Sequence, residues 1–397
     1  MEAGDIAHVE YVAQLARHLA SVPATRIPNP RRGAVAIVIR LVLKDSDDIY
    51  PEYVAPPPLP PTRAATLQSL DRYLKSREFK DARAQVLFIQ RAQYAGDPWS
   101  GNIGFPGGKR EPTDESDRAT AERETREELG LELKTGFVHL GQLDDAPVYL
   151  LGQGIKMAVS PQVYLQTSMH KPELVLSNEV ASAHWVDFTC VVDRIDKPVR
   201  PFSTQYQSVS TDIAARVFRT YALAQPWWLR VLSACVGKLH YTVLALPYTR
   251  GDSVCQLASG SAGADLRVRV SDSTQFATDS ELHLWGLSLG MVAELVDLSL
   301  PVAPRRLSKY WSVASPWPQL GGRLWADVNW ATNAVHAMAW TPGRRKPWRA
   351  GRSAADFLLA YFRVLAVVLP VSCVAKAAAA SYLFGRVLLA LGVKQQS

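Results

Sequence analysis

Three glutamates, Glu124, Glu127 and Glu128, have the residue type and spacing that can hold a divalent metal ion. On a helix, positions three and four apart are neighbours, so the three carboxylates would share one sector of the surface. Such like charges repel one another, and a bound cation would offset that repulsion. Oxygen ligands that are packed close without forming a cage suit Mg²⁺ or Mn²⁺, which keep several waters and bind phosphate. The pattern therefore predicts phosphate chemistry, although the same glutamates would also suit the solvated face of an amphipathic helix.

The residues around these glutamates favour a metal site for phosphate chemistry over a solvated helix face. Gly107 and Gly108 permit positive φ and a close approach of the backbone. Ser116 or Asp114 could cap a helix that ends at Gly130. The segment therefore predicts a tight turn followed by a capped helix. An apolar stripe beside the acidic sector consists of Ala121, Thr125 and Leu129.

The same segment resembles the Nudix box, a motif with a glycine, an acidic residue, Arg-Glu, a paired Glu-Glu and a final glycine in fixed order. The positions that match are Gly108, Asp114 or Glu115, Arg123, Glu124, Thr125, Glu127, Glu128, Gly130 and Leu131. The resemblance implies an α/β (α+β) fold, a Nudix α/β/α sandwich with a mixed sheet. It also implies a pyrophosphatase that uses Mg²⁺ or Mn²⁺ to hydrolyse a nucleoside diphosphate linked to another group.

The acidic position of the box departs from the usual spacing. From Gly108 the usual offset falls on Asp114, which lies one residue too far from Arg123, whereas Glu115 meets only the offset to the arginine. This one-residue insertion resembles the coenzyme A diphosphatase branch of the family. The signature of that branch is matched by Arg91 with Ala92, by Gly101 and by Phe105, Pro106, Gly107 and Gly108, but Gly96 or Asp97 stands where the branch has a second arginine.

The resemblance implies a role for each matching residue. The metal ligands would be Glu124, Glu127 and Glu128, and Arg123 would orient these carboxylates. Glu179, in a segment that resembles a late Glu-Val element of the family, would act as a base or orient a loop. The base could equally be Glu128 or a hydroxide on the metal. The predicted catalytic set is Arg123, Glu124, Glu127, Glu128 and Glu179, and the predicted substrate or loop set is Arg91, Phe105, Pro106, Gly107, Gly108, Asp114 and Glu115.

Elements that would position this site are indicated on both sides of it. Apolar periodicity predicts helices over residues 7–21, 67–80 and 281–298, and the last would complete the fold with Trp285, Leu289, Val292 and Val296 facing the core. Residues rich in β-branched side chains predict strands from Gly33 onward and over 85–92, 137–143 and 155–166. We expect an N-terminal helical segment (1–32), a Nudix domain (33–300) with an insertion at about 201–280, and a C-terminal extension (301–397). A strand over 238–248 could pair with the main sheet.

The C-terminal extension differs in composition from the rest of the chain. Between Pro301 and Ala354 there are nine arginines and lysines against one acidic residue, and six of the eleven tryptophans lie between Trp311 and Trp348. Residues 357–393 are almost wholly apolar, but their longest uncharged run is 12 residues, short of the roughly 20 that span a membrane. An interfacial membrane anchor and a helical pair packed on the catalytic domain are both compatible with this pattern.

Composition limits the remaining choices. The 397 residues include 48% hydrophobic and 20% charged side chains with a net charge of +7, which is typical of a globular protein. The four scattered cysteines predict reduced thiols, and the acidic N-terminus predicts that there is no cleaved signal. We therefore expect an intracellular protein, in the cytoplasm or on an organelle. If it is bound to a membrane, we expect the C-terminus to attach it. We expect coenzyme A or an acyl derivative as the substrate. The alternatives are an RNA 5′-end pyrophosphohydrolase and a non-catalytic membrane or complex scaffold.

Overall fold

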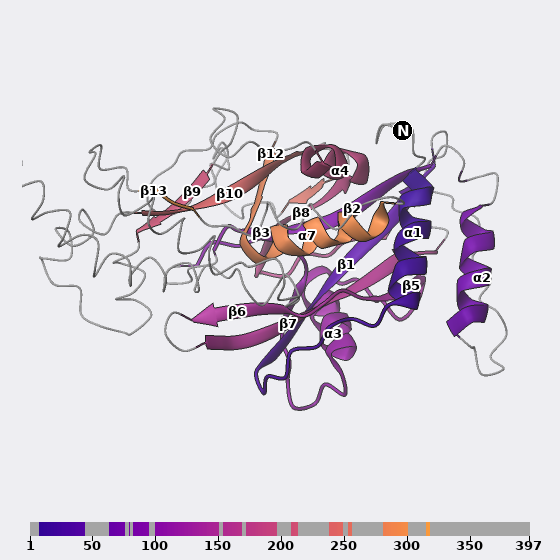
Figure 1. The fold of residues 1–397 in the computed structure, drawn as a ribbon, viewed down its shortest axis with the longest axis horizontal. Coiled ribbons are helices and arrows are strands. Elements are labelled where there is room, and N and C mark those ends of the chain that lie inside the picture. Colours follow the sequence, from indigo (N-terminus) through magenta and orange to yellow (C-terminus); the bar gives the residue numbers. More distant parts are fainter. Residues whose placement is uncertain are drawn as a thin grey trace, which may run out of the picture. The chain divides into compact units, whose positions relative to one another are not determined.

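The computed structural model describes residues 8–43, 63–75, 79, 82–94, 100–150, 154–168, 172–196, 208–212, 238–248, 253–255, 281–300 and 315–317. The chain divides into two compact units, one of residues 1–148, 155–209 and 241–312 and the other of residues 149–154, 210–240 and 313–397. The helices are α1 (His8–Ser21), α2 (Arg63–Leu74), α3 (Asp117–Leu129), α4 (Phe188–Asp196) and α7 (Gly286–Ser299) (Figure 1). The strands are β1 (Arg32–Val42), β2 (Arg83–Arg91), β3 (Ile103–Gly104), β4 (Gly107–Lys109), β5 (Phe137–Gln142), β6 (Ala146–Leu150), β7 (Gly154–Gln166), β8 (Val180–Asp187), β9 (Ser208–Asp212), β10 (Lys238–Pro247), β11 (Ser253–Cys255), β12 (Glu281–Trp285) and β13 (Ser315–Trp317).

A mixed sheet of nine strands dominates the described part of the first unit. Its main path runs β11-β8-β2-β1-β7-β5, with β3 beside β2, β4 beside β1 and β6 beside β7. β1 pairs in parallel with β7 and antiparallel with β2 and β4. β1 is therefore the central strand, and its run of β-branched residues is buried on both faces, as predicted. The α/β class with a mixed sheet is confirmed.

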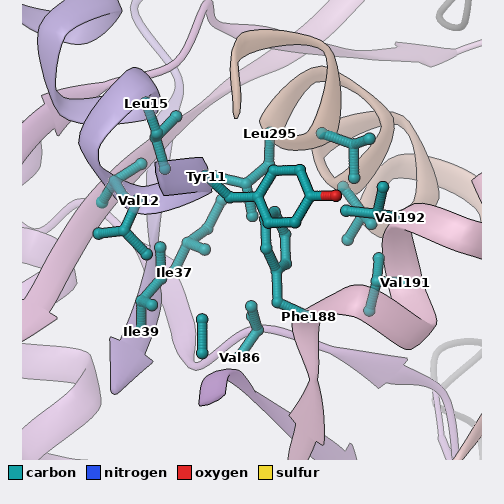
Figure 2. Close-up of a cluster of buried hydrophobic side chains, with 14 of the residues drawn as sticks. Tyr11, Val12, Leu15, Ile37, Ile39, Val86, Phe188, Val191, Val192 and Leu295 are labelled. Atoms are coloured by element: carbon teal, nitrogen blue, oxygen red, sulfur yellow. The ribbon is translucent and has the colours of Figure 1, made fainter. Parts of the chain in front are cut away.

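One face of this sheet carries the larger hydrophobic core. Helices α1, α4 and α7 cover it, and α1 contacts α2 and α7 (Figure 1). Tyr11 of α1 meets Phe188 of α4 edge-to-face, with ring centroids 5.9 Å apart. Figure 2 shows this cluster, in which the labelled side chains are Tyr11, Val12, Leu15, Ile37, Ile39, Val86, Phe188, Val191, Val192 and Leu295. The N-terminal helix thus belongs to the same core as the sheet.

Helix α3 packs on the opposite face. Ala34 and Ala36 of β1 are fully buried beneath it, and their small side chains let the helix lie close to the strand. The second core cluster on this face also includes Leu87, Ile89, Ala121, Leu129, Leu131, Leu133, Tyr164, Val180 and Trp185. The sheet therefore separates a helix-rich face with the larger apolar core from a face that holds the acidic helix.

Two sequence-based predictions about the later part of the chain need correction: the helix over 281–298 is confirmed only from Gly286, with Leu289, Val292 and Val296 buried, and the pairing of the strand over 238–248 is wrong. Residues 281–285 form strand β12 rather than the first turn of a helix, and α7 starts only at Gly286, whose φ is +67°. Strand β10 pairs antiparallel with β12 in a separate sheet and not with the main sheet. Alternating apolar residues in 281–285 fit both periodicities over so short a run, and tertiary pairing decided between them. In the second unit, β13 pairs with residues 238–240 of β10.

The C-terminal predictions fall almost entirely outside the described residues, which include only 315–317 beyond residue 300. In the part of the chain that is described, no helix has both the length and the apolar character to cross a membrane. Membrane attachment through residues 357–393 stays a prediction.

Replacing Gly107 by alanine should lower the free energy of unfolding by about 1–3 kcal/mol. Its φ is +149°, and a Cβ there would overlap the Ala34 carbonyl oxygen and the Val35 backbone. Gly290→Ala in α7, where a Cβ meets nothing within 4 Å, is the matched control. It should be neutral or stabilise by up to about 1 kcal/mol. Urea denaturation of both variants measures this, and a Gly107→Ala protein as stable as the wild type would contradict the geometry.

Candidate active site

Helix α3 is held in place by caps and by its buried stripe. Ser116 is the N-cap and accepts a hydrogen bond from the Ala119 amide at 3.1 Å, and Gly130 ends the helix with φ of +66°. The predicted stripe of Ala121, Thr125 and Leu129 is fully buried. These residues confirm the predicted helix, and they fix which side chains face the sheet. The acidic side chains then lie along the edge of that interface.

The glycine turn lies between this helix and the central strand. Gly107 and Gly108 of β4 pair with Val35 and Ala34 of β1. A Cβ on Gly108 would overlap the Glu124 carboxylate, so the missing side chain leaves the space that this carboxylate occupies. Both glycines are therefore required by close approach, Gly107 toward the strand and Gly108 toward the helix.

Glu128 is the most buried of the predicted metal ligands, with 3% of its surface exposed. Its Oε2 accepts a hydrogen bond from the Gly107 amide at 2.8 Å, and the Arg91 Nη1 lies 4.0 Å from its Oε1. Burial raises the pKa of Glu128 to about 8, against the hydrogen bond from Gly107, and the negative charges of Glu124 and Glu179 raise it further. Ionising this carboxylate therefore costs free energy that neither the Gly107 amide nor Arg91 offsets.

Glu124 and Glu127 are drawn toward Arg123. The arginine donates to Glu124 Oε1 from Nη2 at 3.0 Å and to Glu127 Oε2 from Nη1 at 2.9 Å. Burial raises the pKa of Glu124, against the pull of Arg123, and the charges of Glu127 and Glu179 add to the increase. The Glu127 side chain is 52% exposed. The predicted role of Arg123, orienting carboxylates by charge-assisted pairs, corresponds to these contacts.

Asp114 anchors Arg123 from the other side. Its two carboxylate oxygens accept from Arg123 Nε at 3.0 Å and Nη2 at 3.1 Å, and its Oδ2 also accepts from Thr120 and from the Glu111 amide. The hydrogen bonds from Arg123 lower the pKa of Asp114 to about 2. Of the two acidic residues that the sequence left open, Asp114 is thus the one that reaches the site. Glu115 is exposed, and its carbonyl accepts a hydrogen bond from Arg110 Nη2 at 3.0 Å.

The segment before β8 brings Glu179 to the same end of α3. The amides of Val175 and Ser177 donate to the carbonyls of Leu129 and Glu128, each at 2.8 Å, and satisfy backbone acceptors at the helix C-terminus. The Ala92 amide donates to the Glu179 carbonyl at 2.8 Å. The Glu179 side chain is exposed, and no described residue forms a hydrogen bond or an ion pair with its carboxylate.

The other predicted loop residues divide between the two faces of the sheet. Arg91, at the end of β2, lies beside Glu128. Phe105 is buried and stacks on Phe88 in the larger core, with ring centroids 5.1 Å apart. The Pro106 carbonyl accepts from the Ala36 amide at 2.8 Å. Phe105 and Pro106 therefore fix the turn against the core and the central strand. The Gly107 amide then reaches Glu128, and Gly108 lies against Glu124.

Sequence reasoning missed an ion network at the start of α3. Asp117, whose side chain is 1% exposed, pairs with Arg32 at 2.7 Å, Arg26 at 2.8 Å and Arg110 at 3.3 Å. Although burial disfavours its charge, Arg32 and the other arginines lower the pKa of Asp117. The network joins the start of β1, the segment before it and the residue after β4 to the helix N-terminus, where a negative charge is favourable. The only feature of the sequence that indicated this network was an acidic residue in the first turn of the helix, and it did not identify the arginines that pair with it.

The oxygen donors fit the metal that the motif implies, although the three predicted ligands are not gathered. Among the residues that the structure describes, no group of three His, Cys, Asp or Glu side chains could hold a metal ion. Arg123 draws Glu124 and Glu127, while Gly107 holds Glu128. All three donors are carboxylates, and two of them have pKa values raised by burial and mutual repulsion. A hard divalent cation such as Mg²⁺ or Mn²⁺ would offset that penalty.

Comparison with known families agrees with this site. Residues 79–206 match the NUDIX domain family. The match runs from just before β2 to beyond α4 and includes the glycine turn, α3 and Glu179. Over these residues the chain is therefore similar to the NUDIX domain family. β1, the strand that pairs with β2, β4 and β7, lies outside the matched residues.

Similarity to individual proteins is more limited. An uncharacterized protein of Schizosaccharomyces pombe is 35% identical over 141 residues, which are 32% of this chain and 42% of that protein. The chain thus spans less than half the length of this relative. A crystal structure of a C. elegans Ap4A hydrolase binary complex is 14% identical over 42% of this chain and 88% of its own, with a TM-score of 0.25. The NUDIX domain of Shewanella oneidensis NrtR complexed with ADP ribose is 14% identical over 42% of this chain and 79% of its own, with a TM-score of 0.24. Structural similarities this weak carry no argument about the chemistry of this chain.

The raised pKa of Glu128 predicts a pH-dependent stability that a conservative substitution removes. Folded metal-free protein should hold the proton of Glu128 up to about pH 8, whereas the unfolded chain loses it near 4.5. The free energy of unfolding should therefore fall as the pH rises from about 5 to about 8. Glu128→Gln has no charge to bury and can still accept from Gly107. It should be more stable than the wild type at about pH 8, by roughly 3–4 kcal/mol, and similar to it near pH 5.

Denaturation in a chelating buffer at several pH values measures this difference. Glu173→Gln, an exposed position, is the control and should follow the wild type. A Glu128→Gln protein whose stability stays parallel to that of the wild type over this pH range would show that Glu128 is ionised when folded.

Proposed function

We propose that this protein hydrolyses the diphosphate of a nucleoside diphosphate linked to another group, as a Nudix-type pyrophosphatase dependent on Mg²⁺ or Mn²⁺. The observation that carries the proposal is the buried Glu128 carboxylate, which lies against the Gly107 amide within the field of Glu124 and Glu179. Carboxylates are rarely concentrated at such cost without a cation, and an active site is where strongly shifted pKa values recur.

The residues that would hold the cation are Glu128 and Glu124, with Glu127 as the exposed third ligand. A divalent cation bound there supplies positive charge that neutralises diphosphate oxygens and favours attack by water on phosphorus. Arg123, itself anchored by Asp114, orients Glu124 and Glu127. Gly108 has no side chain to compete for the space that the Glu124 carboxylate occupies, and Gly107 brings its amide to Glu128. Arg91 adds a positive charge beside Glu128, where a diphosphate would lie.

The reaction needs one proton acceptor. The water oxygen forms a bond to phosphorus, the bridging phosphorus–oxygen bond breaks, and the proton of the water passes to a carboxylate. Glu179 suits this role best, because it shares the field of Glu124 and Glu128 and no described residue pairs with its carboxylate. Glu128 suits it less, because its Oε2 is occupied by the Gly107 amide. We therefore propose Glu179 as the base.

Glu128→Gln should lower kcat by about 100-fold or more, because it removes a ligand charge at the reacting phosphorus. Glu127→Gln should lower it as well, through the loss of the third ligand. The measurement is steady-state hydrolysis with Mg²⁺ and with Mn²⁺, and circular dichroism confirms that each variant is folded. Glu173→Gln, an exposed glutamate outside the site, should keep wild-type turnover. Unchanged hydrolysis in both variants would remove these residues from the mechanism.

The substrate that we propose is coenzyme A or an acyl derivative. The support is the sequence around the site, where Arg91, Ala92, Gly101 and the run from Phe105 to Gly108 resemble the coenzyme A diphosphatase branch. In the structure Arg91 and Gly101 are adjacent in space, since the Gly101 amide donates to the Arg91 carbonyl at 3.2 Å. The branch's second arginine is missing, and its position, Gly96 or Asp97, lies outside the described residues.

A panel of coenzyme A, ADP-ribose, a dinucleoside polyphosphate and triphosphorylated RNA, each with Mg²⁺ and with Mn²⁺, tests the substrate. We expect the highest kcat/KM with coenzyme A, and the products should be adenosine 3′,5′-bisphosphate and phosphopantetheine. Mass spectrometry of the products identifies the bond that breaks. Preference for another member of the panel would keep the reaction class and exclude coenzyme A.

The RNA 5′-end pyrophosphohydrolase and the non-catalytic scaffold stay alternatives. Both depend on the basic, tryptophan-rich extension, of which the structure describes only residues 315–317. The same panel separates them, because an RNA enzyme would cleave the triphosphorylated RNA and a scaffold would cleave nothing.

A further inference from the structure

Tyr94 is a rigidly held aromatic side chain that the mechanism does not use. It follows β2 by three residues, and it is 48% exposed. The other large apolar side chains that are exposed in the described part of the chain are aliphatic. An aromatic ring with half of its surface in water gains little from its own burial. The exposed face of the ring is therefore available for contact with a ligand.

Tyr94 is anchored at its ring hydroxyl and at its backbone. Its hydroxyl donates to the Asn178 carbonyl oxygen at 2.7 Å. At the other end, the Tyr94 amide donates to Ser100 Oγ and that hydroxyl donates back to the Tyr94 carbonyl, both at 3.0 Å. A ring held in this way loses little further freedom when a ligand binds, so a contact to its face is gained at low entropic cost.

These anchors place Tyr94 at the rim of the acidic site. Asn178, which accepts from the ring hydroxyl, precedes Glu179, and the Glu179 carbonyl accepts from the Ala92 amide. Arg91, three residues before Tyr94, lies 4.0 Å from Glu128. The segment from Arg91 to Tyr94 thus leads from the place of the diphosphate to the exposed ring. Nucleoside diphosphates carry a flat base on the far side of a ribose from their phosphates.

We propose that the Tyr94 ring is the platform on which the nucleobase of the substrate stacks. This inference rests on the proposed function, since it supplies the nucleoside end of the same site. Stacking on an aromatic ring suits every base, because each has a flat face. The Tyr94 hydroxyl already donates its proton to the Asn178 carbonyl, so it cannot donate to a base edge. The site should therefore bind nucleoside diphosphates with little preference among bases.

Equilibrium binding to the full-length protein tests the platform without turnover. The probes are ADP, UDP and inorganic pyrophosphate in the presence of Mg²⁺, measured by isothermal titration calorimetry. Tyr94→Leu should weaken the binding of ADP about tenfold, which is about 1.4 kcal/mol, and should leave that of pyrophosphate unchanged. Tyr94→Phe keeps the ring and loses only the bond to Asn178. It should bind ADP within about twofold of the wild type, because the face of the ring is retained and only the anchor through the hydroxyl is lost.

The two variants separate a platform from a residue that merely positions the 177–179 loop. Equal losses of ADP affinity in Tyr94→Phe and Tyr94→Leu would assign the effect to the hydroxyl and overturn the proposal. So would a loss of pyrophosphate binding equal to the loss of ADP binding, or wild-type ADP affinity in Tyr94→Leu. Val22→Ala, at another exposed apolar side chain, is the control and should bind all three probes normally. If no member of the substrate panel is cleaved while ADP binding still depends on the ring, the proposed hydrolysis fails and the platform stands.

Discussion

The burial of one carboxylate against one backbone amide is the constraint on which the site depends. Glu128 is 3% exposed, and its hydrogen bond from Gly107 joins the last turn of α3 to the strand that lies beside β1. A single amide does not offset the desolvation of a charge, and the neighbouring carboxylates make the balance worse. The fold therefore maintains a local excess of negative potential that only protonation or a cation can relieve.

That arrangement requires the helix, the turn and the central strand to approach closely. Small residues occur at each contact: Ala34 and Ala36 beneath α3, Gly107 against β1 and Gly108 beside the Glu124 carboxylate. Close-packed interiors tolerate little change in volume at such points. The Arg32–Asp117 pair and the donation from Val175 and Ser177 to the α3 carbonyls hold the two ends of the helix. The acids are thus positioned by contacts at both ends of the element that carries them.

The two faces of the sheet have different tasks. The larger core binds α1, α4 and α7 with aliphatic and aromatic side chains, and the turn residue Phe105 is anchored in it by stacking on Phe88. The opposite face combines a small apolar cluster with the charged residues of α3. Stability comes mainly from the first face, because apolar burial is the dominant favourable term in folding. The second face can consequently hold groups that are unfavourable on their own.

Local signals determined much of this protein in advance. The Gly-Gly turn, a cap at Ser116 or Asp114, the stripe of Ala121, Thr125 and Leu129 and the Gly130 stop predicted α3 and its buried face correctly, because caps and periodicity act within a few residues of the chain. The β-branched run of β1 likewise predicted a strand buried on both faces.

Tertiary structure decided the rest. It divided the glutamates, leaving Glu128 buried and Glu127 exposed beside Arg123, and it chose Asp114 over Glu115. It also turned residues 281–285 into a strand and placed Tyr94 against Asn178. These outcomes depend on partners that are distant in the chain, and no local pattern specifies which distant groups will compete for a side chain.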